Sequence, residues 1–249
     1  RTITGEEGEV KPMRFLWTEQ SIQWYLDASA YTGFHQHLAT RIVPYLEESD
    51  TLCDVGCGLG RLDLEIAPHV SALTAIDIDE RVVAKLQQDA GLLGLQNFCA
   101  RRANATELNN PFDVMIMSFF GGAGSGMGEY LRFCRRKLIR IVNAENRGNL
   151  YPGNHRRTVK ETIATVQQEL SDQGYRYELV ADTIEFGQPL RSWREAGQFV
   201  LYNAPGATER EVNDFMREKA EHTGRDDFPV YLPNPKDIGI FVIHGGDRT

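Results

Sequence analysis

The sequence has few cysteines, and their spacing does not suit cross-linking or zinc binding. Only four occur in 249 residues, and none form a C-x-x-C pair: Cys53, Cys57, Cys99 and Cys134. Three of them lie in apolar, strand-like or buried-looking stretches. A disulfide framework and a zinc site are therefore not expected, and reduced thiols in a cytoplasmic protein are the simpler interpretation.

Long hydrophobic runs are also missing. No window approaches the roughly 20 apolar residues that a membrane-spanning helix needs. Residues 1–12 are polar and acidic, so they have neither the basic start nor the apolar stretch of a signal peptide. We expect this segment to be a flexible leader, because it holds few apolar anchors. No membrane partner is predicted.

Positive charge is in deficit as well. The formal net charge is −8, which argues against a protein whose main task is to grip a polyphosphate backbone. Two local basic clusters remain, and for both we favour solvated helix-surface charge over nucleic-acid contact. The second lies near the expected mouth of the site, where a cation could meet an acidic small molecule. The clusters are Arg132, Arg135, Arg136, Lys137 and Arg140, then Arg156, Arg157 and Lys160.

Strand-like and helix-like stretches alternate through the middle of the chain. Val114–Phe120 is a nearly continuous apolar run, as expected for a strand covered on both faces. Such alternation predicts an α/β fold, a parallel sheet with helices on both faces. The other expected strands are Asp50–Val55, Ala72–Asp77, Asn97–Ala103, Leu138–Ala144, Tyr175–Phe186 and Asp237–His244. The expected helices between them are Leu62–His69, Glu80–Leu93, Met127–Cys134 and Val159–Leu170.

The alternation breaks near both ends of the chain. Residues 13–48 are rich in aromatics at helical spacings, and we expect them to form a lid. Two further helices, Ser192–Tyr202 and Thr208–His222, lie in a stretch without strand signals. The predicted organisation is a leader (1–12), a helical lid (13–48), a Rossmann-like core (49–187), a small helical cap insertion (188–235) and the final strand of the core (236–249).

A turn with three glycines follows the first expected strand. Asp54–Gly60 reads D-V-G-C-G-L-G, and such glycines let the backbone bend sharply and let a ligand approach the next helix. A dinucleotide site needs its third glycine at position 61, which is Arg61 here, and a phosphate loop needs a lysine followed by serine or threonine. Asp54 would repel a pyrophosphate. Its charge favours S-adenosylmethionine, which carries a sulfonium and an ammonium group, over NAD.

A second acidic residue, Asp77, closes the next expected strand. At this place in nucleotide-binding folds a carboxylate accepts hydrogen bonds from ribose hydroxyls. The alternative is that Asp77 only caps the helix that begins near Glu80, a role that Asp79 could also fill. We favour the ribose role, because the spacing and the topology both suit it.

Residues from about 50 to 145 resemble the class I S-adenosylmethionine-dependent methyltransferases, a Rossmann-like family, and D-V-G-C-G-L-G matches the family's first motif. The resemblance implies a seven-stranded sheet in the order 3-2-1-4-5-7-6, with the last strand antiparallel, and the cap is similar to insertions in bacterial small-molecule members. It also implies cofactor contacts: the methionine moiety at Asp54, Gly56, Cys57, Gly58 and Gly60, the ribose at Asp77, the adenine at Ile78, Asn104 and Ala105, and the reacting methyl group near Ser118.

Only the absence of known motifs narrows the class of methyl acceptor. Enzymes that methylate nucleobase amines carry an (Asn/Asp/Ser)-Pro-Pro-aromatic turn after the fourth strand, where this chain has S-F-F-G-G, and no cysteine sits beside a proline there. We therefore predict methyl transfer to oxygen, nitrogen or sulfur of a small molecule. The alternatives are an RNA or protein methyltransferase, a non-catalytic module that binds S-adenosylmethionine and, more remotely, a nicotinamide oxidoreductase. The oligomeric state stays open.

Candidate side chains for the reaction come from the lid and from the strand ends. Alignment of the reactants does most of the work in such a transfer, so no fixed catalytic set is required. Two histidines in H-Q-H at residues 35–37 would point apart on a helix, which disfavours a metal site. Candidate general bases are Tyr25, His35 and His155, and candidate substrate contacts are Trp24, Tyr31 and Phe119.

Overall fold

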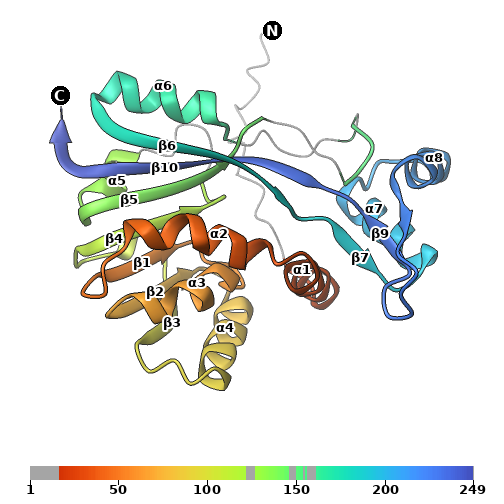
Figure 1. Cartoon of the computed structure of the whole chain (residues 1–249), viewed down its shortest axis with the longest axis horizontal. Helices are drawn as coiled ribbons and strands as arrows, with labels where there is room; N and C mark the ends of the chain where they lie inside the picture. The colour runs from red at the N-terminus through yellow and green to blue at the C-terminus, as the bar shows by residue number, and fades with distance from the viewer. Residues whose placement is uncertain (1–16, 122–126, 146–149, 154, 156–160, 249) are drawn as a thin grey trace, which may run out of the picture.

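A seven-stranded sheet organises the molecule (Figure 1). The structure, a computed structural model, describes residues 17–121, 127–145, 150–153, 155 and 161–248. The predictions for residues 1–12 and for the basic cluster of Arg156, Arg157 and Lys160 lie outside the described residues.

The strand order is β3-β2-β1-β4-β5-β10-β6. β10 pairs antiparallel with both of its neighbours, and β3, β2, β1, β4 and β5 pair in parallel. This is the order 3-2-1-4-5-7-6 with β10 as the seventh strand, so the predicted fold class is confirmed. The strands are β1 (Thr51–Val55), β2 (Ala72–Asp77), β3 (Phe98–Arg102), β4 (Phe112–Ser118), β5 (Cys134–Asn143), β6 (Tyr175–Glu185) and β10 (Pro235–Arg248).

Helices cover both faces of the sheet, because the central strands are apolar on both sides. On one face Ile116 of β4 belongs to a core with α2, α3 and α4. On the other face Met115 and Met117 of the same strand belong to a core with α5 and α6. These helices are α2 (Phe34–Ile42), α3 (Arg61–Ile66), α4 (Glu80–Leu92), α5 (Met127–Leu131) and α6 (Ile163–Gln173), and short 3₁₀ turns span Val43–Tyr45, Ala67–His69 and Ala105–Glu107.

One predicted helix is wrong in its second half. The sequence predicts Met127–Cys134, but α5 ends at Leu131, and β5 already begins at Cys134. Backbone pairing with β4, which begins at Cys134 opposite Phe112, decides the outcome over the local helical pattern. Most of the first basic cluster therefore lies on a strand rather than on a helix surface.

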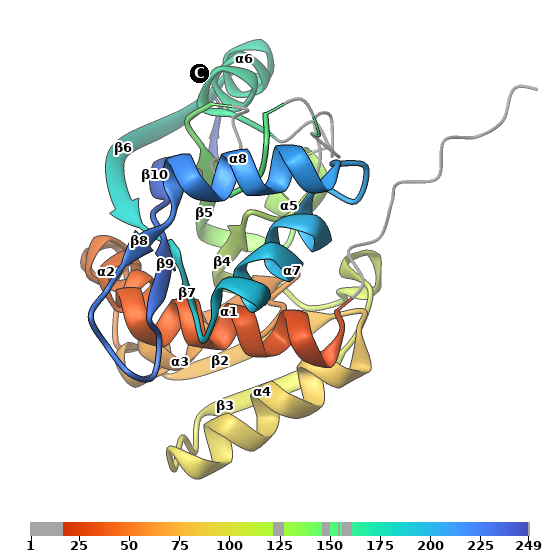
Figure 2. The same ribbon diagram turned by 90° about the vertical axis from the view of Figure 1, so that its right-hand side faces the viewer.

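Residues 188–232 build a second unit, which includes strands that the sequence analysis missed. Helices α7 (Trp193–Asn203) and α8 (Glu209–Lys219) accompany a three-stranded sheet in the order β7-β9-β8 (Gln188–Leu190, Val230–Leu232, Glu221–His222). The predicted helix Thr208–His222 ends at Lys219, and its last two residues form β8. We call this unit the cap. Helix α1 (Glu19–Thr32) runs alongside α7 and contributes Trp24 to the core of the cap (Figure 2).

Arg140 is the largest charged side chain of the interior. It lies on β5 with no exposed surface, forms an ion pair with Glu161 and lies 3.9 Å from Glu169. Burying ions is unfavourable unless partners of opposite charge accompany them, so these groups stabilise the fold only as a set.

We expect Arg140→Met to lower the free energy of unfolding by about 3–5 kcal/mol, because it leaves Glu161 buried without its partner. The matched control is Arg135→Met on the same strand, whose exposed side chain pairs with Asp113; its loss should stay below about 1 kcal/mol. Urea titration measures both variants, and equal losses would contradict the assignment.

Candidate functional site

The glycine turn after β1 lies at the carboxyl edge of the parallel strands. Gly56, Gly58 and Gly60 have φ values of 74°, 54° and 55°, in the left-handed region that glycine tolerates best. The N–H groups of Gly56 and Cys57 both donate to the carbonyl oxygen of Ile76, at 2.8 and 3.0 Å. The turn is thus bonded to the end of β2.

Two of the glycines are also required by their neighbours. A Cβ on Gly56 would lie 1.9 Å from the ring of Phe120, and a Cβ on Gly60 would lie 2.3 Å from Leu86. The ring of Trp17 lies 3.5 Å from the corresponding point on Gly58. Close packing therefore requires glycine at positions 56 and 60, and aromatic rings lie close to the turn.

Asp77 fastens the turn to β2 through its side chain. One carboxylate oxygen accepts from the N–H of Gly58 at 3.0 Å, and the other accepts from the N–H of Asp79 at 2.9 Å. Asp79, not Asp77, caps α4, since it accepts from the N–H of Arg81. Ile78 beside them is 46% exposed, so its side chain is available to a ligand. The ribose role of Asp77 stays a prediction.

Asn104 and Ala105 belong to a 3₁₀ turn after β3. The side-chain oxygen of Asn104 accepts from the N–H of Thr106 at 3.1 Å, and Glu107 completes a capping box. This local role accounts for the asparagine without a ligand. Its predicted contact with adenine stays a prediction.

The end of β4 has an unusual backbone. Phe119, directly after Ser118, has φ 51° and is the one non-glycine residue with a positive φ in the described part of the chain. Its N–H donates to the carbonyl oxygen of Ile141 at 2.9 Å, and the amine of Lys236 lies 3.5 Å from its ring centre. Left-handed backbone in a bulky residue is unfavourable and often marks a functional position.

Asp63 is a member of the site that the sequence analysis missed. It lies on α3, fully buried, with neither carboxyl oxygen hydrogen-bonded to a described donor, and the carboxyl group of Asp54 lies close enough to interact with it. Burial raises the pKa of Asp54 to about 7 and that of Asp63 well above its usual range. A charged residue among Leu62, Leu64 and Ile66 was the available signal.

Tyr25 and His35, both predicted as candidate bases, lie together in one network. The hydroxyl of Tyr25 lies 2.9 Å from Nε2 of His35, and the hydroxyl of Ser29 lies 2.7 Å from Nδ1. Burial, then the charges of Lys236 and Arg61, lowers the pKa of His35 to about 3. Burial, then the nearby carboxyls of Asp54 and Asp63, raises the pKa of Tyr25. Both groups are neutral around pH 7.

The other predicted side chains lie toward the cap. Trp24 is buried, and its indole N–H donates to Glu195 at 3.0 Å. Tyr31 stacks on Tyr231 with ring centres 5.1 Å apart. Nε2 of His155 lies 3.1 Å from Glu211 of α8. The structure does not bring these three to the glycine turn, so their predicted roles at the reaction centre gain no support from their contacts.

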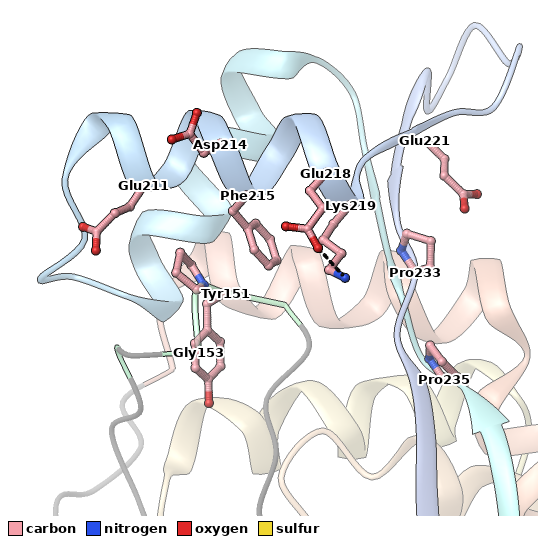
Figure 3. Close-up of a pocket in the computed structure, with 11 residues that line it drawn as sticks. Tyr151, Gly153, Glu211, Asp214, Phe215, Glu218, Lys219, Glu221, Pro233 and Pro235 are labelled. Atoms are coloured by element: carbon pink, nitrogen blue, oxygen red, sulfur yellow. Dashed lines mark ion pairs between the residues drawn. The ribbon is translucent and has the colours of Figure 1, made fainter.

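A groove of about 810 Å³ lies against the cap (Figure 3). Tyr151–Gly153 lies opposite α8, and Pro233 and Pro235 lie on the strand side. Its wall is acidic, because α8 contributes three carboxylates and the one lysine, Lys219, pairs with Glu218 at 3.0 Å. The acidic side chains are Glu211, Asp214, Glu218 and Glu221.

The first basic cluster does not form an open positive surface. Arg136 pairs with Glu47 and Asp50, and Lys137 donates to the carbonyl oxygen of Tyr45. Arg132 lies over the ring of Phe133, and Arg140 is buried. Among the described helices, none is long and apolar enough to cross a bilayer.

Comparisons with known proteins agree with this geometry. The profile of a family described as a methyltransferase domain matches residues 46–185, more than half of the chain. The chain belongs to this methyltransferase family. A curated relative, the probable cobalt-precorrin-6B C(15)-methyltransferase (decarboxylating) of Methanothermobacter thermautotrophicus, is 29% identical over 92 residues, which cover 36% of this chain and 48% of the relative. The chain thus spans about half the length of that relative.

Solved structures of methyltransferases share the fold. Magnesium protoporphyrin IX methyltransferase from Synechocystis PCC 6803, with bound S-adenosylhomocysteine, is 15% identical, with 85% of this chain and 84% of that chain covered and a TM-score of 0.53. A putative RNA methyltransferase from Pyrococcus horikoshii is 11% identical, with 85% and 83% covered and a TM-score of 0.52. These likenesses show that the chain shares the methyltransferase fold.

The buried state of His35 predicts a dependence of stability on pH. Its pKa in the folded protein lies below the usual 6.5, so the unfolded chain binds more protons than the folded one between pH 6.5 and about 3. The contribution of His35 to the free energy of unfolding should therefore fall as the pH falls, by roughly 2 kcal/mol between pH 7 and pH 5.

The variant His35→Gln should remove this part of the pH dependence, as measured by urea unfolding at both pH values. The exposed His69, changed to Gln, is the matched control and should leave the dependence unchanged. A His35→Gln protein with the pH dependence of the wild type would refute the neutral, buried histidine.

Proposed function

We propose that this methyltransferase transfers a methyl group from S-adenosylmethionine to oxygen, nitrogen or sulfur of a small molecule. The observation that carries the proposal is the covered glycine turn. Trp17, just before α1, lies against Gly58, and Tyr25 of α1 lies near the carboxyls of Asp54 and Asp63. A covered site excludes water and suits a small acceptor more than a polymer.

The cap supports this proposal because it fixes α1 in place. Besides the bond from Trp24 to Glu195, the amide of Gln188 donates to the carbonyl oxygen of Trp24 at 3.0 Å. Arg191 pairs with Asp27 at 2.7 Å. We therefore propose that residues 13–48 act as a lid and residues 188–235 as a cap over the core of residues 49–187 and 236–249.

Charge distribution speaks against an RNA acceptor. The described members of the first basic cluster are engaged with acids, a carbonyl oxygen or an aromatic ring, and the groove beside the cap is lined by carboxylates. A phosphodiester backbone needs exposed cations in a row. An RNA or protein acceptor is the second candidate, and a non-catalytic binding module is the third.

The cytoplasm is the proposed compartment, since all four cysteines are unpaired.

The residues at the turn fit the cofactor. Gly56 has no room for a side chain, and one buried oxygen of Asp54 has no hydrogen-bond partner among the described residues. We propose that Asp54 and the turn at Gly56, Cys57, Gly58 and Gly60 hold the methionine moiety. We also propose that Asp77 binds the ribose and that Ser118 and Phe119 lie near the methyl group. The proposed contacts of the adenine are Ile78, Asn104 and Ala105.

Alignment is the main contribution that this chain makes to the reaction. The cofactor supplies an electrophilic methyl group on a sulfonium, and correct placement of the acceptor contributes about 7–11 kcal/mol at best. His35 does not take up a proton near pH 7, because its pKa is about 3 and both ring nitrogens are engaged. Tyr25 stays protonated, so its hydroxyl orients a ligand by hydrogen bonding rather than acting as a base.

The variant Asp77→Asn tests the cofactor site. It removes the charge but keeps one oxygen for the N–H of Gly58, and we expect S-adenosylhomocysteine to bind more weakly by roughly 1–3 kcal/mol. Calorimetry measures this loss. Glu80→Gln, a nearby and highly exposed carboxylate, is the control and should bind as the wild type does. An unchanged affinity in Asp77→Asn would remove Asp77 from the site, and binding of NAD alone would overturn the cofactor site.

The acceptor class is tested with methyl-labelled S-adenosylmethionine. We expect label to be transferred to a small-molecule extract and not to total RNA or protein, because the site is covered and the adjacent groove is acidic. Asp77→Asn should lower the incorporation in parallel with its affinity. Label found in RNA or protein would refute the small-molecule proposal, and no transfer to any fraction would favour the binding module.

A further inference from the structure

Asp63 is a buried ionisable group next to the glycine turn for which the proposed reaction gives no role. It has no exposed surface, and among the described residues neither of its oxygens has a hydrogen-bond partner. It does not cap α3, since no backbone N–H donates to it. It lies directly under the turn, because a Cβ on Gly60 would approach its Oδ2 to 2.9 Å.

Two carboxyl groups in contact need a proton between them. Two adjacent buried carboxylates repel each other when both are ionised, whereas one shared proton allows a hydrogen bond between them. Oδ1 of Asp54 likewise has no hydrogen-bond partner among the described residues, and the backbone N–H of Val55 compensates the charge of this carboxyl only in part. Burial, the largest influence, also raises the pKa of both acids.

The surroundings of the pair add little positive charge. Asp77 on β2 contributes a further negative charge, and the thiols of Cys53 on β1 and Cys57 in the turn are neutral because burial raises their pKa. Tyr25 on α1 is neutral too. Arg61, the cation of α3, already lies 3.5 Å from Asp89 of α4. A cationic ligand is the missing counter-charge.

We propose that Asp63 is a cofactor-site residue that shares one proton with Asp54 until the ammonium group of the cofactor arrives, and that cofactor binding then releases this proton to solvent. The inference rests on the proposed role of Asp54 at the methionine end of the cofactor. The ammonium group takes over as the counter-charge, so the pair becomes fully ionised and no covalent bond changes. Asp63 thereby makes the affinity for the cofactor depend on pH.

Calorimetry of S-adenosylhomocysteine in two buffers of different ionisation enthalpy counts the protons. For the wild type at pH 7 we expect about half to one proton released per ligand, and an affinity that rises up to roughly tenfold per pH unit below the pKa of the pair. Asp63→Asn should release none and show a flat affinity from pH 6 to pH 8. Glu80→Gln, the exposed control, should behave as the wild type.

A ligand without the ammonium group provides a second control. 5′-Methylthioadenosine keeps the adenosine and the thioether, so it should bind without proton release. Release with this ligand as well would overturn the role of the ammonium group. Binding of S-adenosylhomocysteine by the wild type without release would overturn this inference alone, whereas failure to bind it would overturn the cofactor site itself.

The ligand-free protein gives an independent readout. A carboxyl whose pKa is raised by folding binds its proton in the folded state and loses it in the unfolded state above about pH 4. The contribution of the Asp54–Asp63 pair to the free energy of unfolding should therefore fall as the pH rises from 5 toward 8, opposite in sign to the contribution of His35. Asp63→Asn should weaken this fall, and an unchanged pH dependence of unfolding would contradict the shared proton.

Discussion

The hydrogen bonds that fasten the glycine turn to the end of β2 are the constraint on which the rest of the site depends. The carbonyl oxygen of Ile76 accepts from Gly56 and Cys57, and the carboxylate of Asp77 accepts from Gly58. These bonds fix the backbone from Gly56 to Gly58, including two left-handed glycines, and keep the turn at the edge of the sheet. Trp17, which precedes α1, and Asp63 on α3 both lie against the backbone of this turn.

The sheet could be predicted from the sequence, whereas the buried polar contacts could not. Apolar runs and alternating helices predicted the strands, among them the doubly covered run Val114–Phe120, and the resemblance carried by the glycine turn implied their order. Short strands such as β8, with two residues, carry no periodicity to detect. The pairing of Tyr25 with His35 depends on how two helices meet at Gly33, which spacing does not specify.

The misassigned end of α5 has the same physical origin. The local pattern favoured a helix through Cys134, but pairing with β4 outweighs a local preference of a few tenths of a kcal/mol per residue. Arg140 shows the limit most clearly. A basic residue in a basic cluster was expected at the surface. The carboxylates of Glu161 and Glu169, which come from a later segment of the chain, pair with Arg140 and make its burial possible.

The two buried networks of the site differ in their charge balance, and this difference assigns their roles. Around His35 each ring nitrogen has a hydroxyl partner, so the network is complete and holds α1 and α2 together without a ligand. Around Asp54 and Asp63 two acids face each other with no cation between them, so the network is incomplete. A missing positive charge next to the glycine turn suits a cationic cofactor. The ligand that supplies this charge binds in preference to a neutral or anionic nucleotide of similar shape.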